Sequence, residues 1–362
     1  MPRNEDLNAA KRNKNDEFYT QFSDIQRELN CYYLWDKNFL KDKTVLLPCD
    51  DPEWSNFTKF FALNLPLYKM KKLISTSYAA DAKKINFNKQ ISLFEQEQPN
   101  FDISKTNSHG KIFTLDMATL NRKPYAPDAL TFDYLKGDGD FRSAEVKKLR
   151  DEADVIITNP PFSLFREFLK WIMDANKKFI IIANINCITY KEVFPLIMQD
   201  KIWLGNGFSG GNAYFSIPYE YRDKFVEGVY NPEENLVKFR NLHWLTNIDH
   251  GKRHEPLRLM TMEENILHSA HREIRGKGYQ RYDNYDAIEV PYTNAIPSDY
   301  AGVMGVPITF LDKYCLEQFE IVGATESEGV GFSNGLWYKD SQFRQATING
   351  KKIYKRIFIR RR

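Results

Sequence analysis

Short apolar runs alternate with amphipathic segments between residues 23 and 246, and this alternation constrains the fold more than any other feature of the chain. The apolar runs, which predict buried β-strands, lie at residues 44–47, 71–78, 154–158 and 179–185. The amphipathic segments, which predict helices, lie at residues 23–40, 52–64, 143–151, 164–176 and 190–199. This alternation predicts an α/β fold with a mostly parallel sheet that is covered on both faces.

Several other segments complete the predicted fold. Asp51 followed by Pro52 predicts the start of the helix after the first strand. Residues 80–129 are polar and irregular in pattern, which predicts an insertion. Within it, residues 91–94 and 111–115 are predicted to pair as a small hairpin. Further strands, three of them near the far edge of the sheet, are predicted at residues 130–135, 201–204, 213–217 and 242–246.

Asn159, Pro160, Pro161 and Phe162 directly follow the apolar run that ends at Thr158. The side-chain carbonyl of Asn159 can accept one N–H of an amino group on a flat ring, and the backbone carbonyl of Pro160 can accept the other. Phe162 offers a ring face for stacking. Because ligands bind beyond the carboxyl ends of strands in open α/β sheets, the motif predicts a catalytic site for methyl transfer to an adenine amino nitrogen.

An ordinary proline turn after a core strand is the alternative interpretation, because Asn-Pro dipeptides often mark turns. Proline makes up about 5% of residues in proteins, so two adjacent prolines between asparagine and an aromatic residue rarely arise by accident. The buried strand before the motif favours the functional interpretation.

Methyl transfer needs a donor, and S-adenosylmethionine carries an ammonium, a ribose diol and an adenine that require polar partners. Asp50 or Asp51, after the first strand, can bind the ammonium or the ribose. Asp140 can accept from the adenine amino group, while Phe141 packs on the adenine ring. A plain helix cap is the alternative for Asp51, and a turn in a glycine loop is the alternative for Asp140.

Basic residues concentrate in two segments, although the formal net charge is only +3. The C-terminal segment contains Lys351, Lys352, Lys355, Arg356, Arg360, Arg361 and Arg362. The other segment, between residues 250 and 281, contains the predicted DNA-binding residues Lys252, Arg253, Arg272, Arg275 and Lys277. Solvated loops and a mobile basic tail are the alternative interpretation.

The spacing of the cysteines and histidines gives little indication of a metal site. The four cysteines, Cys31, Cys49, Cys187 and Cys315, are widely separated. The histidine pairs 250/254 and 268/271 have no recognisable further ligand, so we expect no metal. The longest apolar stretch, residues 179–185, is too short to span a bilayer, and the first residues lack an apolar signal core. These features predict a cytoplasmic protein with no membrane partner, and a monomer is compatible with all of them.

Ordered stretches over most of the chain resemble the EcoRI-type adenine-specific DNA methyltransferases of bacterial restriction and modification systems. They include the motif Thr158-Asn159-Pro160-Pro161-Phe162. The stretches lie at residues 16–21, 49–52, 55–57, 137–143, 158–167, 188–194, 283–288 and 302–311.

The resemblance implies a Rossmann-like S-adenosylmethionine-dependent methyltransferase fold with a mixed seven-stranded sheet, an insertion and a C-terminal DNA-recognition region. The implied parts are a disordered tail at residues 1–15, a catalytic domain at residues 16–249 with its insertion at about 80–129, and a DNA-recognition and C-terminal region at residues 250–362. Phe18, Tyr19 and Thr20 would lie by the methionine part of the cofactor, and Asn159 would contact both cofactor and base.

The implied activity is methylation of adenine N6 after the base has been flipped out of double-stranded DNA. The enzyme would belong to a type II restriction–modification system, or be an orphan or phage equivalent, in the cytoplasm of a bacterium. Two alternatives stay open at this point. The acceptor could be cytosine N4, an RNA adenine or a protein glutamine, which all present an amino group. The chain could instead be a non-catalytic basic DNA-binding protein with a degenerate methyltransferase core.

Overall fold

A computed structural model describes residues 19–51, 55–79, 100–122, 131–217, 228–325, 332–333, 335–338 and 345–362, and for residues 131 and 132 it describes the backbone alone. The predicted tail, Phe18 and one strand of the predicted hairpin lie outside these residues. The chain divides into two compact units. The first comprises residues 1–187 and 205–249, and the second comprises residues 188–204 and 250–362. Residues 188–204, which were predicted as part of the catalytic domain, therefore group with the second unit.

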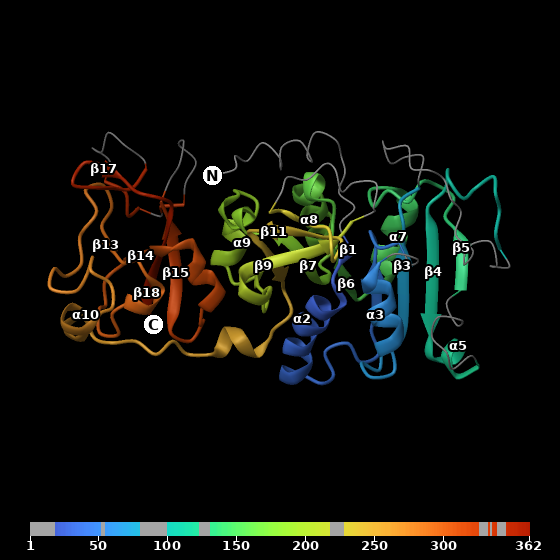
Figure 1. The fold of residues 1–362 in the computed structure, drawn as a ribbon, viewed down its shortest axis with the longest axis horizontal. Coiled ribbons are helices and arrows are strands. Elements are labelled where there is room, and N and C mark those ends of the chain that lie inside the picture. The colour runs from blue at the N-terminus through green and yellow to red at the C-terminus, as the bar shows by residue number, and fades with distance from the viewer. Residues whose placement is uncertain are drawn as a thin grey trace. The chain divides into compact units, whose positions relative to one another are not determined.

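The first unit alternates helices and strands in its first 187 residues and is mostly β-structure after residue 205 (Figure 1). Its helices are α2 (Phe22–Trp35), α3 (Asn56–Asn64), α5 (Met117–Arg122), α7 (Ala144–Glu152), α8 (Phe165–Asp174) and the 3₁₀ turns η2 (Phe162–Leu164) and η4 (Ser209–Gly211). Its strands are β1 (Tyr19–Thr20), β2 (Thr44–Leu47), β3 (Lys72–Thr76), β4 (Lys111–Asp116), β5 (Thr131–Tyr134), β6 (Val155–Thr158), β7 (Lys178–Asn184), β9 (Asn212–Ser216), β10 (Tyr230–Asn231), β11 (Leu236–Arg240) and β12 (Leu242–Thr246). The 3₁₀ turn η3 (Ile185–Thr189) spans the boundary with the second unit.

The main sheet of the first unit has the strand order β5-β4-β3-β2-β6-β7-β12. The neighbours β3, β2, β6 and β7 are parallel to one another. The pairs β3–β4, β4–β5 and β7–β12 are antiparallel. The prediction of an α/β fold is therefore confirmed, but the sheet is mixed and parallel only at its centre, whereas the alternation of strands and helices predicted a mostly parallel sheet.

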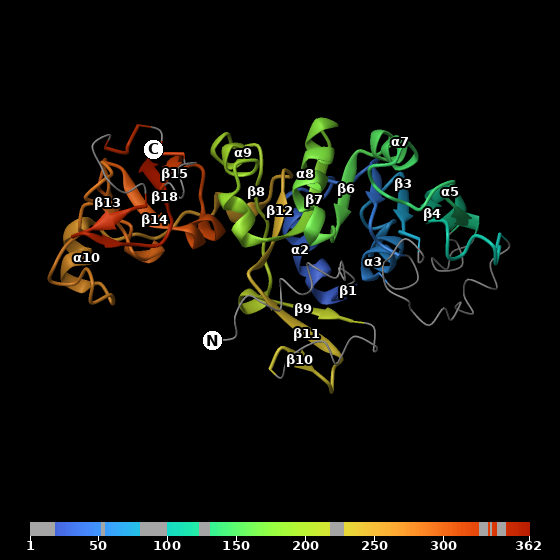
Figure 2. The same cartoon turned by 90° about the horizontal axis from the view of Figure 1, so that it is seen from above.

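The central strands are buried along their whole length because helices cover both faces of the sheet. Every residue of β2 and of β6 is buried, as expected for continuous apolar runs. Figure 2 shows α2 and α3 on one side of the sheet and α7 and α8 on the other. The side chains of Val45, Leu47 and Ile157 join the core cluster under α2 and α3. Because β2 and β6 are parallel neighbours, their carboxyl ends lie side by side.

Three details of the first unit differ from the prediction. Helix α3 begins at Asn56, because Ser55 rather than Asp51 is its N-cap and accepts from the backbone N–H of Phe57. Strand β4 belongs to the main sheet, where its alternating burial suits pairing with β3 and β5 instead of a separate hairpin. Strand β9 was predicted near the edge of the main sheet, but it lies in a smaller sheet with the order β1-β9-β11-β10.

The second unit combines short helices with a four-stranded sheet in the order β13-β14-β18-β15 and a two-stranded sheet formed by β16 and β17. Its helical elements are α9 (Phe194–Met198), α10 (Met262–His268) and the 3₁₀ turns η6 (Gly251–His254), η7 (Thr293–Ala295) and η8 (Ile308–Lys313). Its strands are β8 (Trp203–Leu204), β13 (Ile288–Glu289), β14 (Met304–Pro307), β15 (Phe319–Ala324), β16 (Thr347–Ile348), β17 (Lys351–Lys352) and β18 (Arg356–Arg361). It has its own core, which includes Tyr285 and Phe358.

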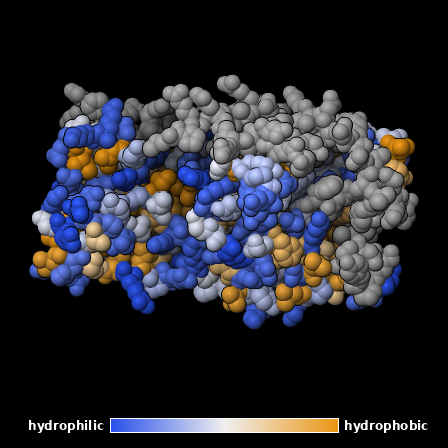
Figure 3. Space-filling view, in the orientation of Figure 1, coloured by the Kyte–Doolittle hydropathy of each residue, from blue (hydrophilic) through white to orange (hydrophobic). Residues whose placement is uncertain are grey.

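The described surface is mainly polar. Figure 3 shows blue, hydrophilic residues over much of the described part of one face, with orange apolar groups among them. Leu34, Trp35, Leu63 and Leu67 are among the large apolar side chains that are at least half exposed. Isolated groups of this kind are normal for a water-exposed surface. No helix in the described part of the chain is both long enough and apolar enough to cross a membrane.

Candidate active site

The tetrapeptide Asn159 to Phe162 lies at the carboxyl end of β6, where the sequence predicted it. Strand β6 is flanked by the parallel strands β2 and β7, so the motif stands at the centre of the sheet edge. Pro161 accepts a hydrogen bond from the backbone N–H of Leu164 at 3.0 Å, which closes the short turn η2. The ring of Phe162 is partly buried and packs against the core under α2 and α3. The motif is therefore held between a buried strand and helix α8.

Asp50 follows β2 on the same edge, and its carboxyl group is buried, with 5% of the residue exposed. Ser55 donates to its Oδ1 at 2.7 Å, and Thr158 donates to its Oδ2 at 2.6 Å. Thr158 is the last residue of β6 and precedes Asn159. Burial raises the pKa of the Asp50 carboxyl to about 7, although the hydrogen bonds from Thr158 and Ser55 lower it and the charge of Asp51 raises it. Asp50 thus links the loop after β2 to Thr158, which directly precedes the tetrapeptide.

Tyr19 and Thr20 lie near the same loop, because β1 is tied to helix α3. The side chain of Asn56, the first residue of α3, donates to the carbonyl of Thr20 at 2.8 Å. On its other side β1 pairs with β9, with Tyr19 opposite Ser216. Asn56 also follows the Asp50 partner Ser55. The structure therefore brings together four segments: β1, the loop after β2, the start of α3 and the end of β6.

Asp140 lies in the loop after β5, and this loop folds against the end of β3. The backbone N–H of Ala79 donates to the carbonyl of Asp138 at 2.7 Å. Gly139 has a φ of +83°, and a Cβ on it would lie 2.2 Å from the carbonyl oxygen of Ser77, so glycine is required there. The Asp140 carboxylate forms an ion pair of 2.6 Å with Arg142, a contact that sequence analysis did not predict.

Phe141 does not occupy the position predicted for it. Only 5% of the residue is exposed, and its ring makes edge contacts with Phe168 and Trp171 of helix α8 at centroid distances of 5.1 and 5.6 Å. These contacts place the ring in the core instead of on a ligand-binding surface. A short loop has no regular residue pattern from which burial can be predicted. The sequence alone therefore could not show whether the ring of Phe141 lies in the core or on a ligand-binding surface.

Tyr78 is a residue of this edge that sequence analysis missed as a site candidate. It was included in the strand at residues 71–78, but β3 ends at Thr76, so Tyr78 stands beyond the carboxyl end of a parallel strand. Burial, together with the charges of Asp138 and Asp140, raises its pKa. An aromatic residue at the carboxyl end of a predicted strand is the signal that could have identified it.

Two of the predicted DNA-binding residues make ion pairs within the protein. Lys252 lies 2.7 Å from Asp312. Arg253 is buried, with 7% of the residue exposed, pairs with Asp200 and lies 3.6 Å above the ring of Trp203. A guanidinium enclosed in this way is directed to protein groups and not to a phosphate. Arg253 is therefore a structural residue of the second unit.

Arg272, Arg275 and Lys277 are exposed on a compact segment, residues 271–278, which we call the basic turn. The buried side chain of Ile274 anchors it, and the backbone N–H of Arg275 donates to the carbonyl of His271 at 3.0 Å. No ion pair of the three cations occurs among the residues that the structure describes. Three cations therefore project from a fixed backbone.

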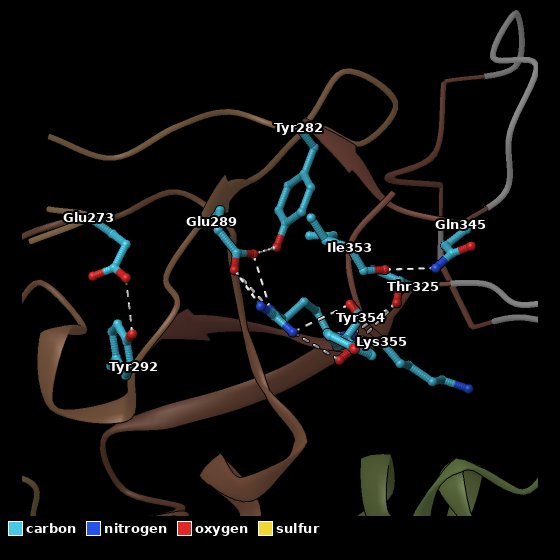
Figure 4. Close-up of polar contacts among 10 residues, drawn as sticks. Glu273, Tyr282, Glu289, Tyr292, Thr325, Gln345, Ile353, Tyr354 and Lys355 are labelled. Atoms are coloured by element: carbon cyan, nitrogen blue, oxygen red, sulfur yellow. Dashed lines mark hydrogen bonds and ion pairs between the residues drawn. The ribbon is translucent and has the colours of Figure 1, made fainter. Parts of the chain in front are cut away.

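The basic turn is also fastened to the neighbouring turn η7. The His271 ring stacks on that of Tyr292 at a centroid distance of 3.6 Å, and the Tyr292 hydroxyl donates to Glu273 at 3.3 Å (Figure 4). His271 Nε2 lies 2.8 Å from the side-chain oxygen of Asn294. These contacts order the segment without using its three cations.

The C-terminal basic run forms a strand, not a mobile tail. Strand β18 lies between β14 and β15 in the sheet of the second unit. Arg356, its first residue, makes a bidentate ion pair with the buried carboxylate of Glu289, which also accepts from the hydroxyl of Tyr282 (Figure 4). Arg360 pairs with Glu320 on β15. The charge of Arg356 is therefore paired with a buried carboxylate of the protein.

Within the described ranges no group of three or more His, Cys, Asp or Glu side chains is arranged to hold a metal ion. Cys31, Cys49, Cys187 and Cys315 are all free thiols.

Comparison with known proteins gives full-length matches. The model of a family described as "Adenine-specific methyltransferase EcoRI" matches residues 6–362. The Type II methyltransferase M.EcoRI of Escherichia coli is 40% identical over 357 residues, which cover 98% of this chain and 95% of that protein. The Type II methyltransferases M.MgeORF184P of Mycoplasma genitalium and M.MpnI of Mycoplasma pneumoniae are 30% and 29% identical, each with 98% of both chains covered. No solved structure gives a significant match.

Proposed function

The chain belongs to the EcoRI family of adenine-specific methyltransferases, and from this premise we propose that it methylates the N6 amino group of a flipped-out adenine in double-stranded DNA. The relatives carry the name Type II methyltransferase, which supports a role as the modification enzyme of a restriction–modification system or as an orphan or phage equivalent. The first unit would be the catalytic domain, with a Rossmann-like arrangement of β3, β2, β6 and β7. The second unit would recognise DNA.

The reacting group explains why the motif at the end of β6 has its composition. The lone pair of an exocyclic amino nitrogen is delocalised into the ring, so the nitrogen is a weak nucleophile. The side-chain oxygen of Asn159 and the backbone carbonyl of Pro160 would accept the two N6 hydrogens. The ring of Phe162 would stack on the adenine. This arrangement localises the lone pair on N6 and holds it toward the methyl donor.

S-adenosylmethionine, as donor, supplies a methyl group activated by a sulfonium. Residues at the sheet edge offer hydrogen-bond acceptors for the polar groups of this cofactor. Asp51, which is partly exposed after β2, would bind the ammonium or the ribose, and Asp140 would accept from the cofactor's adenine amino group. Tyr78 offers the aromatic face that the buried Phe141 does not. Tyr19 and Thr20, which are held at the start of α3 by the hydrogen bond from Asn56 to the carbonyl of Thr20, would lie by the methionine part of the cofactor.

The observation that carries the proposal is the placement of Asn159 at the central carboxyl edge of the sheet, next to Thr158, whose hydroxyl donates to Asp50 in the loop after β2. The test is digestion of plasmid DNA, incubated with the enzyme and S-adenosylmethionine, to nucleosides for mass spectrometry. We expect N6-methyladenine in the product. N4-methylcytosine, or methylation of RNA or protein alone, would reject adenine in DNA as the acceptor. Methylation-aware sequencing of the same DNA would identify the target site.

Replacement of Phe162 tests the stacking role. We expect Phe162→Tyr to retain activity, because it keeps the ring face, and Phe162→Ala to lose the ~1–3 kcal/mol of one base–aromatic stack, measured as a drop in kcat/KM. Phe162→Leu is the matched control, since it restores apolar bulk toward the core without an aromatic face. Recovery of full activity in the leucine variant would show that Phe162 only fills space.

The basic turn supplies a second test, on DNA affinity. We expect Arg272→Ala, Arg275→Ala and Lys277→Ala each to weaken DNA binding and to reduce the slope of log K against log salt by about 1. Fluorescence anisotropy with a labelled duplex at several salt concentrations measures this slope. Lys170→Ala is the control, because the ammonium of Lys170 already pairs with Asp174 on α8. An unchanged slope in all three variants would remove the basic turn from the DNA interface.

A further inference from the structure

We propose that Asp50 is a positioning residue for the catalytic motif, because its carboxylate holds the end of β6 through the hydroxyl of Thr158 and so sets the place of Asn159. This inference rests on the proposed function. It also replaces the direct cofactor contact that the sequence predicted for Asp50. The group acts on the base-binding residue, not on the methyl donor.

The geometry around the carboxyl group supports this role. Both carboxylate oxygens accept from hydroxyls of the protein, Oδ1 from Ser55 at 2.7 Å and Oδ2 from Thr158 at 2.6 Å. Thr158 is fully buried, and Ser55 is fixed as the N-cap of α3. The two contacts join segments that are distant in sequence, since Thr158 lies 108 positions from Asp50. Through these two hydrogen bonds the carboxylate connects the end of β6 to the start of α3.

The backbone of Asp50 is held as firmly as its side chain. Its carbonyl accepts from the hydroxyl of Ser75 on β3 at 2.6 Å. The Ser75 hydroxyl lies 2.7 Å from that of Thr58 on α3, and all these groups are buried. Strand β3, helix α3 and strand β6 therefore all fix this one residue. Its carboxylate therefore has a fixed position, and the hydrogen bond from Thr158 fixes the end of β6 relative to it.

Thr158 transmits this position to the active site because it directly precedes Asn159. Loss of its hydrogen bond frees the last residue of β6 to shift. A displacement of about 1 Å at a reacting group can lower the rate of a step on the order of 100-fold. The consequence falls on the chemical step and leaves cofactor affinity intact.

The ionisation of Asp50 adds a signature that a purely structural role would not produce. Burial raises its pKa to about 7. Among the titratable groups, Asp51 on the same loop raises this pKa, whereas α3, β3 and β6 contribute hydroxyls. The pKa of the neighbouring Cys49 thiol is itself raised by burial and by the charge of Asp50. Below about pH 7 the carboxyl carries a proton, so one of the two hydroxyls must turn to accept from it. Above that pH both can donate, and we expect the rate of methyl transfer to rise.

The test compares Thr158→Val and Asp50→Asn with the wild-type protein, using plasmid DNA and saturating S-adenosylmethionine in single-turnover reactions from pH 6 to pH 8.5. We expect the wild-type rate to rise through about pH 7. Both variants should be on the order of 10- to 100-fold slower at pH 8 and should have a flat profile. The Kd for S-adenosylmethionine, measured by calorimetry, should stay within about threefold of the wild-type value in both.

Thr246→Val is the matched control, because Thr246 is also fully buried on a strand of the same sheet and donates to the carbonyl of Phe179 at 2.7 Å. It should keep the wild-type rate and pH profile. A wild-type rate and pH rise in Thr158→Val would overturn the inference alone, as would a tenfold weaker Kd for S-adenosylmethionine in Asp50→Asn with an unchanged rate at saturation. Absence of N6-methyladenine in the wild-type reaction would overturn the proposed function, and this inference with it.

Discussion

Replacement of Asn159 by alanine is expected to reduce methyl transfer to DNA to the limit of detection while S-adenosylmethionine still binds. The side-chain oxygen of Asn159 would be the acceptor that helps to localise the N6 lone pair. Removal of one polar group that acts at the reacting centre costs at least on the order of 100-fold in rate. Transfer of a labelled methyl group to plasmid DNA measures the rate, and calorimetry measures cofactor binding.

Asn64→Ala is the matched control for this variant. Asn64 is the last residue of α3, the end of the helix away from Ser55, and its side chain donates to the carbonyl of Phe60. It loses the same amide group in the same unit, so it should retain activity. Transfer at the parental rate by the Asn159 variant would refute the catalytic assignment, whatever the control shows.

The centre of the fold could be predicted because its strands are buried on both faces. The predicted strand at residues 44–47 is β2, and those at residues 154–158 and 179–185 match β6 and β7 to within one residue at each end. Continuous apolar runs of this kind have few alternative structures. The helix after Ser143 was also predicted correctly, since Ser143 caps α7 by accepting from the N–H of Val146.

Long-range pairing explains the errors in the fold. Strand β4 alternates buried and partly exposed residues, a pattern that equally suits an isolated hairpin. Its pairing with β3 depends on contacts about 40 residues apart, such as that between Ile74 and Thr114. No local pattern encodes such a choice. The same holds for β9, whose partner Tyr19 lies near the start of the chain.

The position of the candidate site could be predicted from the sequence, whereas the burial of each of its residues could not. Asn159 could be selected because an unusual set of residues follows a buried strand. Asp50 and Asp51 are the same residue type and lie in the same loop. Only the structure shows that Thr158 and Ser55 donate hydrogen bonds to the carboxylate of Asp50. Arg253 and Arg272 likewise differ in burial and not in residue type. Burial of polar side chains depends on partners far away in sequence.

Removal of one partner from the ion pair between Arg356 and Glu289 is expected to destabilise the second unit strongly. The two side chains are 14% and 10% exposed, and Arg356 Nη2 lies 2.7 Å from Glu289 Oε1. Arg356→Met removes one partner and leaves a buried carboxylate that, among the described residues, keeps the hydrogen bond from the hydroxyl of Tyr282. Such a change costs ~3–5 kcal/mol in the free energy of unfolding. Urea denaturation followed by circular dichroism measures this loss.

Two further variants separate the buried pair from the general effect of removing positive charge from β18. Arg360→Ala removes a cation from the same strand, but its pair with Glu320 is roughly half exposed, so it should cost only ~0–1 kcal/mol. The double variant Glu289→Gln with Arg356→Met should recover most of the loss, because the glutamine still accepts from Tyr282 and no charge stays buried. Equal losses for Arg356→Met and the double variant would mean that lost packing, and not an unpaired carboxylate, destabilises the unit.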